Sequence, residues 1–325
     1  MADAAEAVAQ AIRQGSDFVL TFHENPDGDS VGSTLAMARA LRRMGKRATV
    51  ASPGPVPKTF RFLPGVDGVI PWEQVVGEYS VALIIDCGDI NRFGPAGKSL
   101  VEKAPVILNV DHHLTNSRFG HVNYVDSHAA AAGEQVTAIL DRLGVDLDKE
   151  MAVCLLTALM TDTGCYRYPN TSPDTLALAS RLVAAGGSPA LVAEYVYDTR
   201  TLSSLRLLDV ALSRLELSAG GKVAWSVVRS QDFADTGATE AEAEGIVNYP
   251  RTIDGVEVGL LFRETPEGKV KVAFRSRRTV DVSRIALTFG GGGHARAAGC
   301  TYEGTLAEAL ERVLSNVLAS AGDRR

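Results

Sequence analysis

The chain has 325 residues, of which 46% are hydrophobic and 22% are charged. This composition is typical of a folded globular protein and argues against global disorder, and the length is sufficient for two domains. The formal net charge of −6 excludes a chain that coats nucleic acid through uniform positive charge, so any polyanion must be bound by a local basic patch.

The first fifteen residues have the pattern of an acidic amphipathic helix and lack the basic and apolar regions of a secretory signal. No apolar run approaches the roughly 18 residues that a membrane span requires. The four cysteines show no Cys-x-x-Cys spacing, which is typical of reduced thiols. We therefore expect a cytoplasmic protein that does not bind membranes.

The first half of the chain alternates predicted strands with predicted helices. Near-continuous apolar runs, expected for parallel strands covered on both faces, lie at 17–22, 47–51, 81–85 and 105–110. Helices are predicted at 30–44, 133–143, 149–161 and 175–185. Asp29 or Ser30 is placed to cap the first of these helices. The alternation indicates an α/β fold whose N-terminal domain is built on a doubly wound, mainly parallel sheet.

The second half of the chain predicts a helical connector and a smaller α/β domain. Strands are expected at 223–229, 256–264 and 270–276, the last two as a hairpin, and helices are expected at 282–288 and 305–319. We divide the chain into a catalytic domain over 1–188, a connector over 189–217 and a substrate-binding domain over 218–325. The active site is expected in the cleft between the two domains.

Side chains typical of metal ligands follow three predicted strands and one predicted helix: His23, Asp27, Asp29, Asp86, Asp111, His112, His113 and Asp162. In open parallel sheets, sites form at the carboxyl ends of the strands. Two like charges 4 Å apart repel by about 4 kcal/mol at an effective dielectric of 20, and divalent cations remove that cost. Two cations roughly 3.5–4 Å apart can also clamp a phosphoryl group and generate hydroxide at neutral pH. Mixed imidazole and carboxylate ligands suit manganese, iron, cobalt or zinc better than calcium.

Each of these residues has an ordinary alternative when it is taken singly. An aspartate after a strand or helix, such as Asp86 or Asp162, is most often a cap or a turn residue. Pairs such as His112 and His113 are commonly surface or core histidines, and Pro26-Asp27-Gly28 is by itself a turn signal. The ordinary interpretation requires independent coincidences at several element ends, whereas a metal centre accounts for all of them.

The motifs at 23–30, 86–89, 111–113 and 161–164 resemble the four motifs of the DHH phosphoesterase superfamily: His-x-Asn-Pro-Asp-Gly-Asp-Ser, Asp-Cys-Gly-Asp, Asp-His-His and Thr-Asp-Thr-Gly. The segment Gly-Gly-Gly-Gly-His-Ala-Arg-Ala-Ala-Gly at 290–299 resembles the signature of the DHH-associated C-terminal domain. The length and layout look most like the nanoRNase group. That resemblance implies an oligoribonuclease that also dephosphorylates 3′-phosphoadenosine 5′-phosphate, and some members cleave cyclic dinucleotides or their linear products.

The resemblance also implies two metal sites that share one carboxylate. One site would consist of His23, Asp27 and Asp86, and the other of Asp29, Asp86, His112 and Asp162. The expected metal is Mn²⁺, with Mg²⁺, Co²⁺ or Fe²⁺ as alternatives. A hydroxide between the two ions would attack the phosphorus atom. His113 would bind the scissile phosphate or assist the leaving oxygen, and Asp111 would orient a histidine.

The C-terminal domain supplies the candidate substrate contacts. Seven basic residues and a single acid lie between positions 269 and 296. Consecutive glycines let backbone N–H groups approach a phosphate or a base closely, and a small-residue helix is expected to start at 297–299. The residues expected to bind the terminal nucleotide are Arg275, Ser276, Gly291, Gly292, Gly293 and His294. Arg92 is a further candidate phosphate contact, with an ordinary surface arginine as the equal alternative.

The leading hypothesis is hydrolysis of RNA of about two to five nucleotides to 5′-mononucleotides, since the compact basic cluster and 6% aromatic content do not suit long strands or long DNA. A RecJ-like exonuclease is disfavoured because no additional oligonucleotide-binding domain fits in the chain. A manganese pyrophosphatase is disfavoured by the glycine loop, and a non-catalytic nucleotide sensor by the complete set of ligands. The alanines at 129–132 replace hydroxyls found in many relatives, which puts the details of substrate contact in doubt. The oligomeric state stays open, and the exposed connector helices would allow a homodimer.

Overall fold

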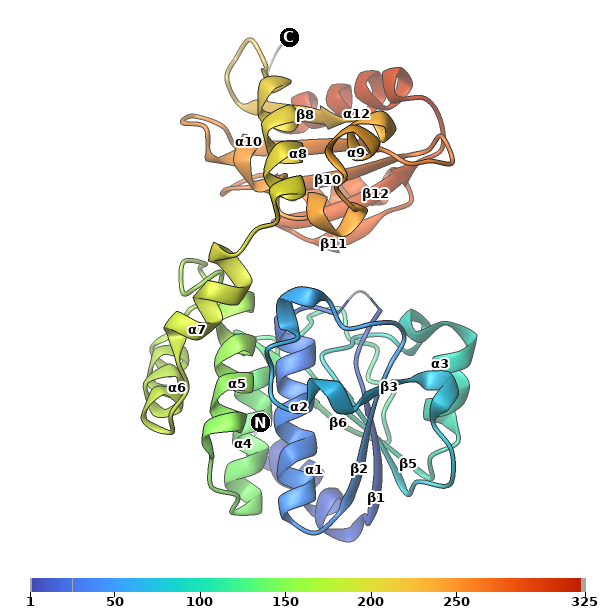
Figure 1. Ribbon diagram of the computed structural model, residues 1–325, viewed down its shortest axis with the longest axis vertical. Helices are drawn as coiled ribbons and strands as arrows, with labels where there is room; N and C mark the ends of the chain where they lie inside the picture. The colour runs from blue at the N-terminus through green and yellow to red at the C-terminus, as the bar shows by residue number, and fades with distance from the viewer. Residues whose placement is uncertain (1, 25, 323–325) are drawn as a thin grey trace. The chain divides into compact units, whose positions relative to one another are not determined.

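The computed structural model of the protein describes residues 2–24 and 26–322. The chain forms two compact units, over residues 1–199 and 200–325, which we call unit 1 and unit 2 (Figure 1). Each unit has its own sheet and its own hydrophobic core. The α/β class predicted for both halves of the chain is confirmed.

Unit 1 is built on a parallel sheet with the strand order β3-β2-β1-β4-β5-β6. The strands are β1 (Asp17–Thr21), β2 (Arg47–Ser52), β3 (Val69–Pro71), β4 (Val81–Ile85), β5 (Val106–Asp111) and β6 (Val122–Val125). The chain leaves β1 toward β2 and β3 on one side and then returns to β4 on the other. This reversal makes the β1/β4 boundary the topological switch point, where open α/β sheets form their sites.

The helices of unit 1 are α1 (Ala2–Gln14), α2 (Gly28–Arg43), α3 (Gly94–Glu102), α4 (Ala132–Leu143), α5 (Lys149–Asp162), α6 (Pro173–Ala184) and α7 (Pro189–Ala193). Short 3₁₀ turns lie at η1 (Lys58–Phe60), η2 (Val66–Gly68), η3 (Trp72–Gln74) and η4 (Ile90–Phe93), and η5 (Glu194–Asp198) is π-helical. Helices α1, α2, α4 and α5 pack on one face of the sheet and α3 on the other. Along β4, Leu83 faces the first core and Ile84 the second, which explains the unbroken apolar run.

Two details of helix α2 and one of α5 differ from the sequence-based expectation. Helix α2 starts at Gly28, because Asp27 and not Asp29 or Ser30 supplies the cap: the Asp27 Oδ1 atom accepts from the Ser30 backbone N–H at 2.9 Å. Helix α5 continues to Asp162, which is therefore its last residue and not the residue after it. Asp27 and Asp162 thus lie at helix ends that point to the same edge of the sheet.

Unit 2 contains a mixed sheet with the order β11-β12-β10-β9-β8-β7. Its strands are β7 (Glu216–Leu217), β8 (Val223–Val228), β9 (Val258–Glu264), β10 (Val270–Ser276), β11 (Gly292–His294) and β12 (Ala297–Tyr302). Its helices are α8 (Leu202–Ser213), α9 (Ser230–Thr236), α10 (Asn248–Thr252), α11 (Val282–Leu287) and α12 (Leu306–Ser320), with a 3₁₀ turn η6 (Glu240–Ala243). The predicted β9–β10 hairpin is confirmed.

The small-residue segment at 297–299 is not the start of a helix, and that expectation was wrong. These residues begin strand β12, which pairs with β10 on one side and with β11 on the other. A Cβ atom added at Gly291 would lie 2.2 Å from the Gly299 carbonyl oxygen, and one at Gly293 would lie 2.5 Å from that of Ala297. The small residues therefore serve close strand packing.

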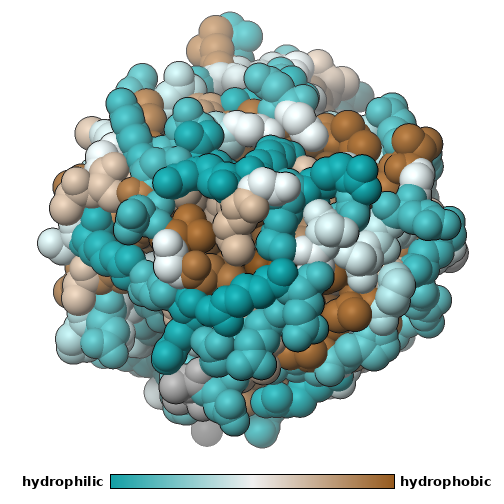
Figure 2. Space-filling model, turned by 90° about the horizontal axis from the view of Figure 1, so that it is seen from below, coloured by the Kyte–Doolittle hydropathy of each residue, from teal (hydrophilic) through white to brown (hydrophobic). Residues whose placement is uncertain are grey.

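Within the described residues, no single helix is long and apolar enough to cross a membrane. Only the pair formed by Pro173–Ala184 and Pro189–Asp198, which is bent by 106°, has that length and composition when both parts are counted together. Large hydrophobic side chains such as Leu114 and Val76 are exposed singly. The face in Figure 2 shows small separate groups of hydrophobic residues among hydrophilic ones, as on many globular proteins.

Candidate metal centre

Carboxylates and imidazoles converge at the carboxyl ends of β1, β4 and β5. His23 follows β1, Asp86 directly follows β4, and His112 directly follows β5. Asp29, in the first turn of α2, and Asp162, at the end of α5, reach the same place because α2 and α5 pack along each other. The topology therefore brings residues 139 positions apart in the chain to one edge of the sheet.

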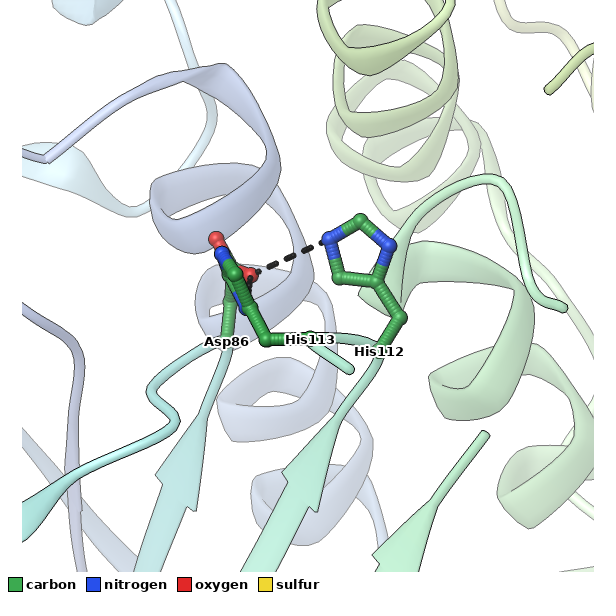
Figure 3. Close-up of side chains that lie close together, drawn as sticks. All are labelled: Asp86, His112 and His113. Carbon is green, nitrogen blue, oxygen red and sulfur yellow. Dashed lines mark ion pairs between the residues drawn. The ribbon is translucent and has the colours of Figure 1, made fainter. Parts of the chain in front are cut away.

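Three groups of potential ligands can be drawn, each with its donor atoms within 4.8 Å of one another: His23, Asp27 and Asp86; Asp29, His112 and Asp162; and Asp86, His112 and His113. The Asp86 Oδ2 atom lies 3.6 Å from His23 Nε2, and its Oδ1 atom lies 3.5 Å from His112 Nε2. Figure 3 shows Asp86 beside both neighbouring histidines. Asp86 and His112 are thus the residues through which the three groups are joined, because each of them belongs to two groups.

Backbone carbonyls orient two of the histidines. The Nδ1 atom of His23 lies 2.6 Å from the Glu24 carbonyl oxygen, and that of His112 lies 3.2 Å from the Ala129 carbonyl oxygen. Donation from each Nδ1–H leaves the Nε2 atom facing the carboxylates with its lone pair available for a metal. The alanine segment at 129–132 therefore contributes a backbone acceptor although its side chains carry no hydroxyl.

His113 is held differently from the other two histidines. Its Nδ1 atom lies 2.7 Å from Asp111 Oδ1, closer than the 3.5 Å that separates it from Asp86 Oδ1. His113 faces Asp86 with the same nitrogen that Asp111 engages, whereas His23 and His112 face Asp86 with Nε2, so His113 is the least suited of the three histidines to bind the metal. The geometry agrees with a role for His113 toward a substrate and for Asp111 as its orienting partner.

The carboxylates perturb the titration of every histidine in the centre. Burial disfavours the charged form of His112, but Asp162 and Asp86 outweigh this effect and hold its pKa well above the usual range. The pKa values of His23 and His113 are raised in the same way, against the effect of burial, by Asp86 for His23 and chiefly by Asp111 for His113. In the absence of a cation, protons on these rings stabilise the pooled carboxylates.

The pKa values of the carboxyl groups in the centre are perturbed as well. Burial raises the pKa of Asp162 to about 6, with further repulsion from Asp27 and Asp86. Burial and the charges of Asp86 and Asp162 likewise raise the pKa of Asp29 well above its ordinary value. The pKa of Asp86 is instead lowered, because the adjacent histidines outweigh the effect of burial. Asp86 is therefore the carboxylate best placed to stay ionised and to bind a cation.

Two further observations on Asp86 fit a bound cation. Its Oδ1 atom is buried and has no hydrogen-bond partner among the described residues, which is costly for an ionised oxygen unless an ion occupies that side. Its backbone adopts φ = 57°, in the left-handed region that non-glycine residues rarely enter. Strain of this kind is concentrated at functional sites, where the surrounding fold imposes it. The donor set and the unpartnered oxygen together fit a divalent metal ion.

Asp29 has a second task besides facing the other ligands. Its Oδ2 atom accepts from the Ala132 backbone N–H at 2.6 Å, and its Oδ1 atom accepts from the Gly133 N–H at 3.0 Å. These are the first residues of α4, whose N-cap residue, Ala131, makes no side-chain cap. Asp29 thus caps a helix that lies 103 positions later in the sequence, and it still lies 3.7 Å from His112 Nε2.

The predicted substrate contacts of unit 2 lie on strands β10 and β11, which both pair with β12. Arg275 and Ser276 end β10, Gly291 precedes β11, and Gly292 and Gly293 belong to β11, the edge strand of the sheet. The Ser276 hydroxyl donates to the Ala295 carbonyl oxygen at 3.3 Å and is almost fully buried. Gly292 is exposed, and a Cβ atom added there meets nothing within 4 Å. The side chain of His294 lies outside the described part of the chain.

Most of the basic residues predicted as a polyanion grip have partners within unit 2. Lys269 and Lys271 pair with Glu303 and Glu240 at 2.8 and 2.6 Å. Two arginines donate to backbone carbonyl oxygens, Arg277 to those of Arg251 and Thr252, and Arg296 to that of Val280. This paired cluster is therefore less available for an anion than the count of charges predicts. In unit 1, Arg92 is exposed on η4, whose start is capped by Asp89.

Sequence reasoning missed two asparagines that contact this site. Asn109 lies within the apolar run of β5 and is fully buried, and Asn116 lies three residues after His113. The side chain of Asn116 donates to Asn109 Oδ1 at 2.9 Å and to Asp111 Oδ2 at 2.5 Å. A polar residue in the middle of an otherwise apolar strand was the available signal, since buried amides require partners.

Comparison with known proteins agrees with this geometry. Residues 17–159 match the N-terminal domain of the DHH family, and residues 220–321 match the DHHA1 domain. A Thermus thermophilus protein named bifunctional oligoribonuclease and PAP phosphatase NrnA is 36% identical over 95% of this chain and 92% of its own. The chain belongs to the DHH phosphoesterase family. Its members are metal-dependent hydrolases, and this chain falls in the nanoRNase group.

Other relatives of this DHH protein extend the comparison. A Bacillus subtilis protein also named bifunctional oligoribonuclease and PAP phosphatase NrnA is 26% identical over 87% of this chain and 88% of its own. The cyclic-di-AMP phosphodiesterase PdeA of Listeria monocytogenes is 24% identical over 96% of this chain but only 49% of its own. A crystal structure of an exopolyphosphatase-related protein from Bacteroides fragilis superposes with a TM-score of 0.93 at 25% identity, covering 98% of this chain and 97% of that one.

Proposed function

We propose that this DHH protein hydrolyses oligoribonucleotides of about two to five nucleotides to 5′-mononucleotides, and 3′-phosphoadenosine 5′-phosphate to AMP. The observation that carries the proposal is the set of ligand groups joined by Asp86 and His112. That set occurs in a chain that matches the Thermus oligoribonuclease and PAP phosphatase along almost its whole length. A metal centre of this kind suits phosphoester hydrolysis, and the relatives' names indicate the substrates.

We further propose two ions, most simply Mn²⁺, with Asp86 shared between them. His23, Asp27 and Asp86 would hold one ion, and Asp29, Asp86, His112 and Asp162 the other. The two oxygens of Asp86 face the two histidines separately, at 3.6 and 3.5 Å, which supports this division. When bound, the ions supply Lewis-acid stabilisation of the phosphoryl oxygens and lower the pKa of water to near neutrality.

In this proposal the residues beside the ligands bind and orient the substrate. His113 contacts the scissile phosphate or the leaving oxygen, and Asp111 holds the ring by accepting from Nδ1. Asp111 is fully buried, so its charge is poorly screened and favours a proton on His113. A protonated His113 could donate to a phosphate oxygen or give its proton to the leaving group.

The terminal nucleotide is assigned to the edge of the unit 2 sheet. Among the described strands, β11 pairs with β12 alone, so backbone groups on its other side are open to a ligand. The exposed Gly292 leaves room for close approach, while Gly291 and Gly293 are required by the packing against β12. Arg275, whose register partners on the neighbouring strands are Gly259 and Ala297, and His294 complete the proposed set.

Cyclic dinucleotides or their linear products are a further substrate class, which the likeness to PdeA supports. A RecJ-like exonuclease is the alternative within the same fold: RecJ from Thermus thermophilus in complex with Mn²⁺ superposes with a TM-score of 0.54 at 17% identity, and this chain covers 54% of it. That likeness concerns the fold alone. We place the protein in the cytoplasm and leave a homodimer as the assembly to test.

The deciding experiment measures mononucleotide release from a 5′-labelled RNA series, from a dinucleotide to a 24-mer, with Mn²⁺ and with chelator. The phosphoadenosine compound, a cyclic dinucleotide and pyrophosphate are assayed in parallel. We expect fast, chelator-sensitive cleavage of the shortest RNAs that declines with length, together with release of phosphate from the phosphoadenosine compound. Preference for the 24-mer would favour the exonuclease, and turnover of pyrophosphate alone would overturn the proposal.

A further inference from the structure

A chain of hydrogen bonds runs from the end of β4 to His113 through two asparagines. Asn109 is fully buried, and its Nδ2 atom donates to the Cys87 carbonyl oxygen at 3.1 Å. Its Oδ1 atom accepts from Asn116 at 2.9 Å, and Asn116 also donates to Asp111 Oδ2 at 2.5 Å. The chain therefore connects the loop after Asp86 with the carboxylate that contacts His113.

Both ends of the Asn116 side-chain amide make hydrogen bonds. Its two N–H groups serve Asn109 and Asp111, and its Oδ1 atom accepts from the Arg118 backbone N–H at 2.6 Å. The Asn116 backbone N–H in turn donates to the His113 carbonyl oxygen at 3.1 Å. Because all of these bonds converge, the amide plane is fixed relative to both β5 and the loop that follows His112.

Both oxygens of the Asp111 carboxylate are therefore engaged, each by a different partner. Oδ1 faces His113 Nδ1 at 2.7 Å, and Oδ2 faces Asn116 Nδ2. A carboxylate held at one oxygen alone can rotate about its Cβ–Cγ bond, whereas one held at both cannot. The Asn116 amide is also neutral, so it fixes the direction of Asp111 without cancelling the charge that His113 experiences.

We propose that Asn116 is a positioning residue of this site, which fixes Asp111 and through it the ring of His113. The inference rests on the proposed role of His113 toward the substrate phosphate and extends it to a residue that no motif of the sequence singled out. The backbone beside Asn116 is also tied to the loop after Asp86, because the Ser117 backbone N–H donates to the Gly88 carbonyl oxygen at 2.8 Å.

The test is a double-mutant cycle between Asn116→Ala and His113→Ala, assayed on a dinucleotide and on a generic phosphodiester with Mn²⁺. If Asn116 acts through His113, its substitution lowers kcat by about tenfold or more in the wild-type background and by less than about twofold in the His113→Ala background. Metal content and KM should change little. Equal losses in both backgrounds would show a general structural role and overturn the inference.

Two further variants sharpen the test. Asn116→Asp keeps the shape and the acceptor for Arg118 but replaces the donor to Asp111, so it should lose as much kcat as Asn116→Ala; activity within about twofold of wild type would contradict the proposal. Asn123→Ala is the matched control, because the side chain of Asn123, on β6, makes comparable hydrogen bonds to the backbone of Gly120. It should leave kcat unchanged.

The geometric part of the inference can be measured without any turnover. Crystal structures of the wild type and of Asn116→Ala should differ in the orientation of the Asp111 carboxylate and of the His113 ring. An unchanged contact between Asp111 Oδ1 and His113 Nδ1 in the variant would overturn the inference even if the substrates proposed above were wrong. If only the proposed function were wrong, the wild-type protein would cleave the generic phosphodiester but would not turn over the nucleotides.

Discussion

The two units handle charge in opposite ways. In unit 1, carboxylates of Asp29, Asp86 and Asp162 are gathered around His112, and one buried oxygen of Asp86 has no hydrogen-bond partner among the described residues. In unit 2, several charges are paired with opposite charges: Arg214 pairs with the nearly buried Asp232, and the lysines of β10 and its hairpin turn pair with glutamates. The carboxylates gathered in unit 1 lack a full set of counter-charges, whereas these charges of unit 2 each have an opposite charge beside them.

This difference indicates what each unit needs from a ligand. Pooled carboxylates gain most from divalent cations, so unit 1 provides chemistry only when it is loaded with metal. In unit 2 the lysines near β10 are already paired, and the edge strand β11 carries an exposed glycine, so the recognition proposed there would depend on backbone groups and shape. The division suits an enzyme that must bind a small, highly charged substrate without attracting long polyanions.

The largest effect that would test this contrast is expected from Asp86→Asn. Asparagine tolerates the left-handed backbone at this position, so the variant should fold, but it removes the charge that both proposed metal sites share. We expect turnover to fall by more than about a hundredfold and the bound metal to decrease, as measured by kinetics and elemental analysis. Asp126→Asn, in a nearby loop, should change neither. Retained activity above about a hundredth of wild type would contradict a shared ligand.

The second prediction concerns pH. Because the pKa of Asp162 is raised to about 6 in the folded protein, its contribution to stability is present below the unfolded value of 3.8 and is lost as the pH rises through 6. His112, whose pKa is also raised, contributes stability that is lost at still higher pH. The metal-free protein should therefore become less stable between pH 5 and pH 8, since uncompensated carboxylates accumulate.

Metal binding should reverse this trend, because the ligands bind cations in their deprotonated forms. We expect the rise in melting temperature produced by Mn²⁺ to increase from pH 5 to pH 8, and the affinity for Mn²⁺ to increase by about tenfold or more over the same range. Thermal unfolding with and without Mn²⁺ at each pH measures both. A constant difference in melting temperature would show that protons and metal do not compete.

A smaller effect is expected from Gly292→Ala in unit 2. The added methyl group meets no protein atom within 4 Å, so the fold should be kept while the proposed nucleotide site is obstructed. We expect KM for a dinucleotide to rise by roughly tenfold, about 1.4 kcal/mol of binding, with metal content unchanged. Gly54→Ala, at another open glycine, is the matched control. An unchanged KM would remove strand β11 from the substrate site.

The smallest effect on activity is expected from substitution of a residue in unit 2 whose charge is already paired. Asp232→Ala removes a carboxylate that accepts from Arg214 at 2.8 Å and from the Arg229 backbone N–H at 2.6 Å. We expect a loss of about 1–3 kcal/mol in the free energy of unfolding, because these donors lose their partner. The kcat per folded molecule should stay at the wild-type value. A fall in kcat without a change in stability would contradict a purely structural role.

The sequence predicted the long elements well and the short ones poorly. Strand β4 was predicted to the residue, and α12 to within one residue at each end, because buried apolar periodicity is strong over such lengths. Strands β3 and β6 have three and four residues and were missed, since their pairing depends on neighbours distant in the chain. The residues at 297–299 were assigned to a helix because alanine favours helices, and tertiary packing of strands overrode that propensity.

The candidate site divides in the same way. The sequence predicted which side chains lie together in the candidate metal centre, because the carboxyl ends of neighbouring parallel strands meet at one edge of the sheet and the motif order is distinctive. The actual partners of the basic residues could not be predicted, since Lys269 and Glu303 are 34 positions apart and meet only in the folded sheet. Nor could the link between Asn116 and Asp111, because it depends on the path of one loop.

The bonds from Asp29 to the start of α4 have a practical consequence. Two backbone amide protons, those of Ala132 and Gly133, point at a carboxylate that we expect to bind metal. Their NMR resonances should therefore shift when an ion withdraws electron density from that carboxylate. In isotopically labelled protein, these two signals would report occupancy of the site that includes Asp29 during a titration with a diamagnetic cation, without any substrate and without a reporter dye.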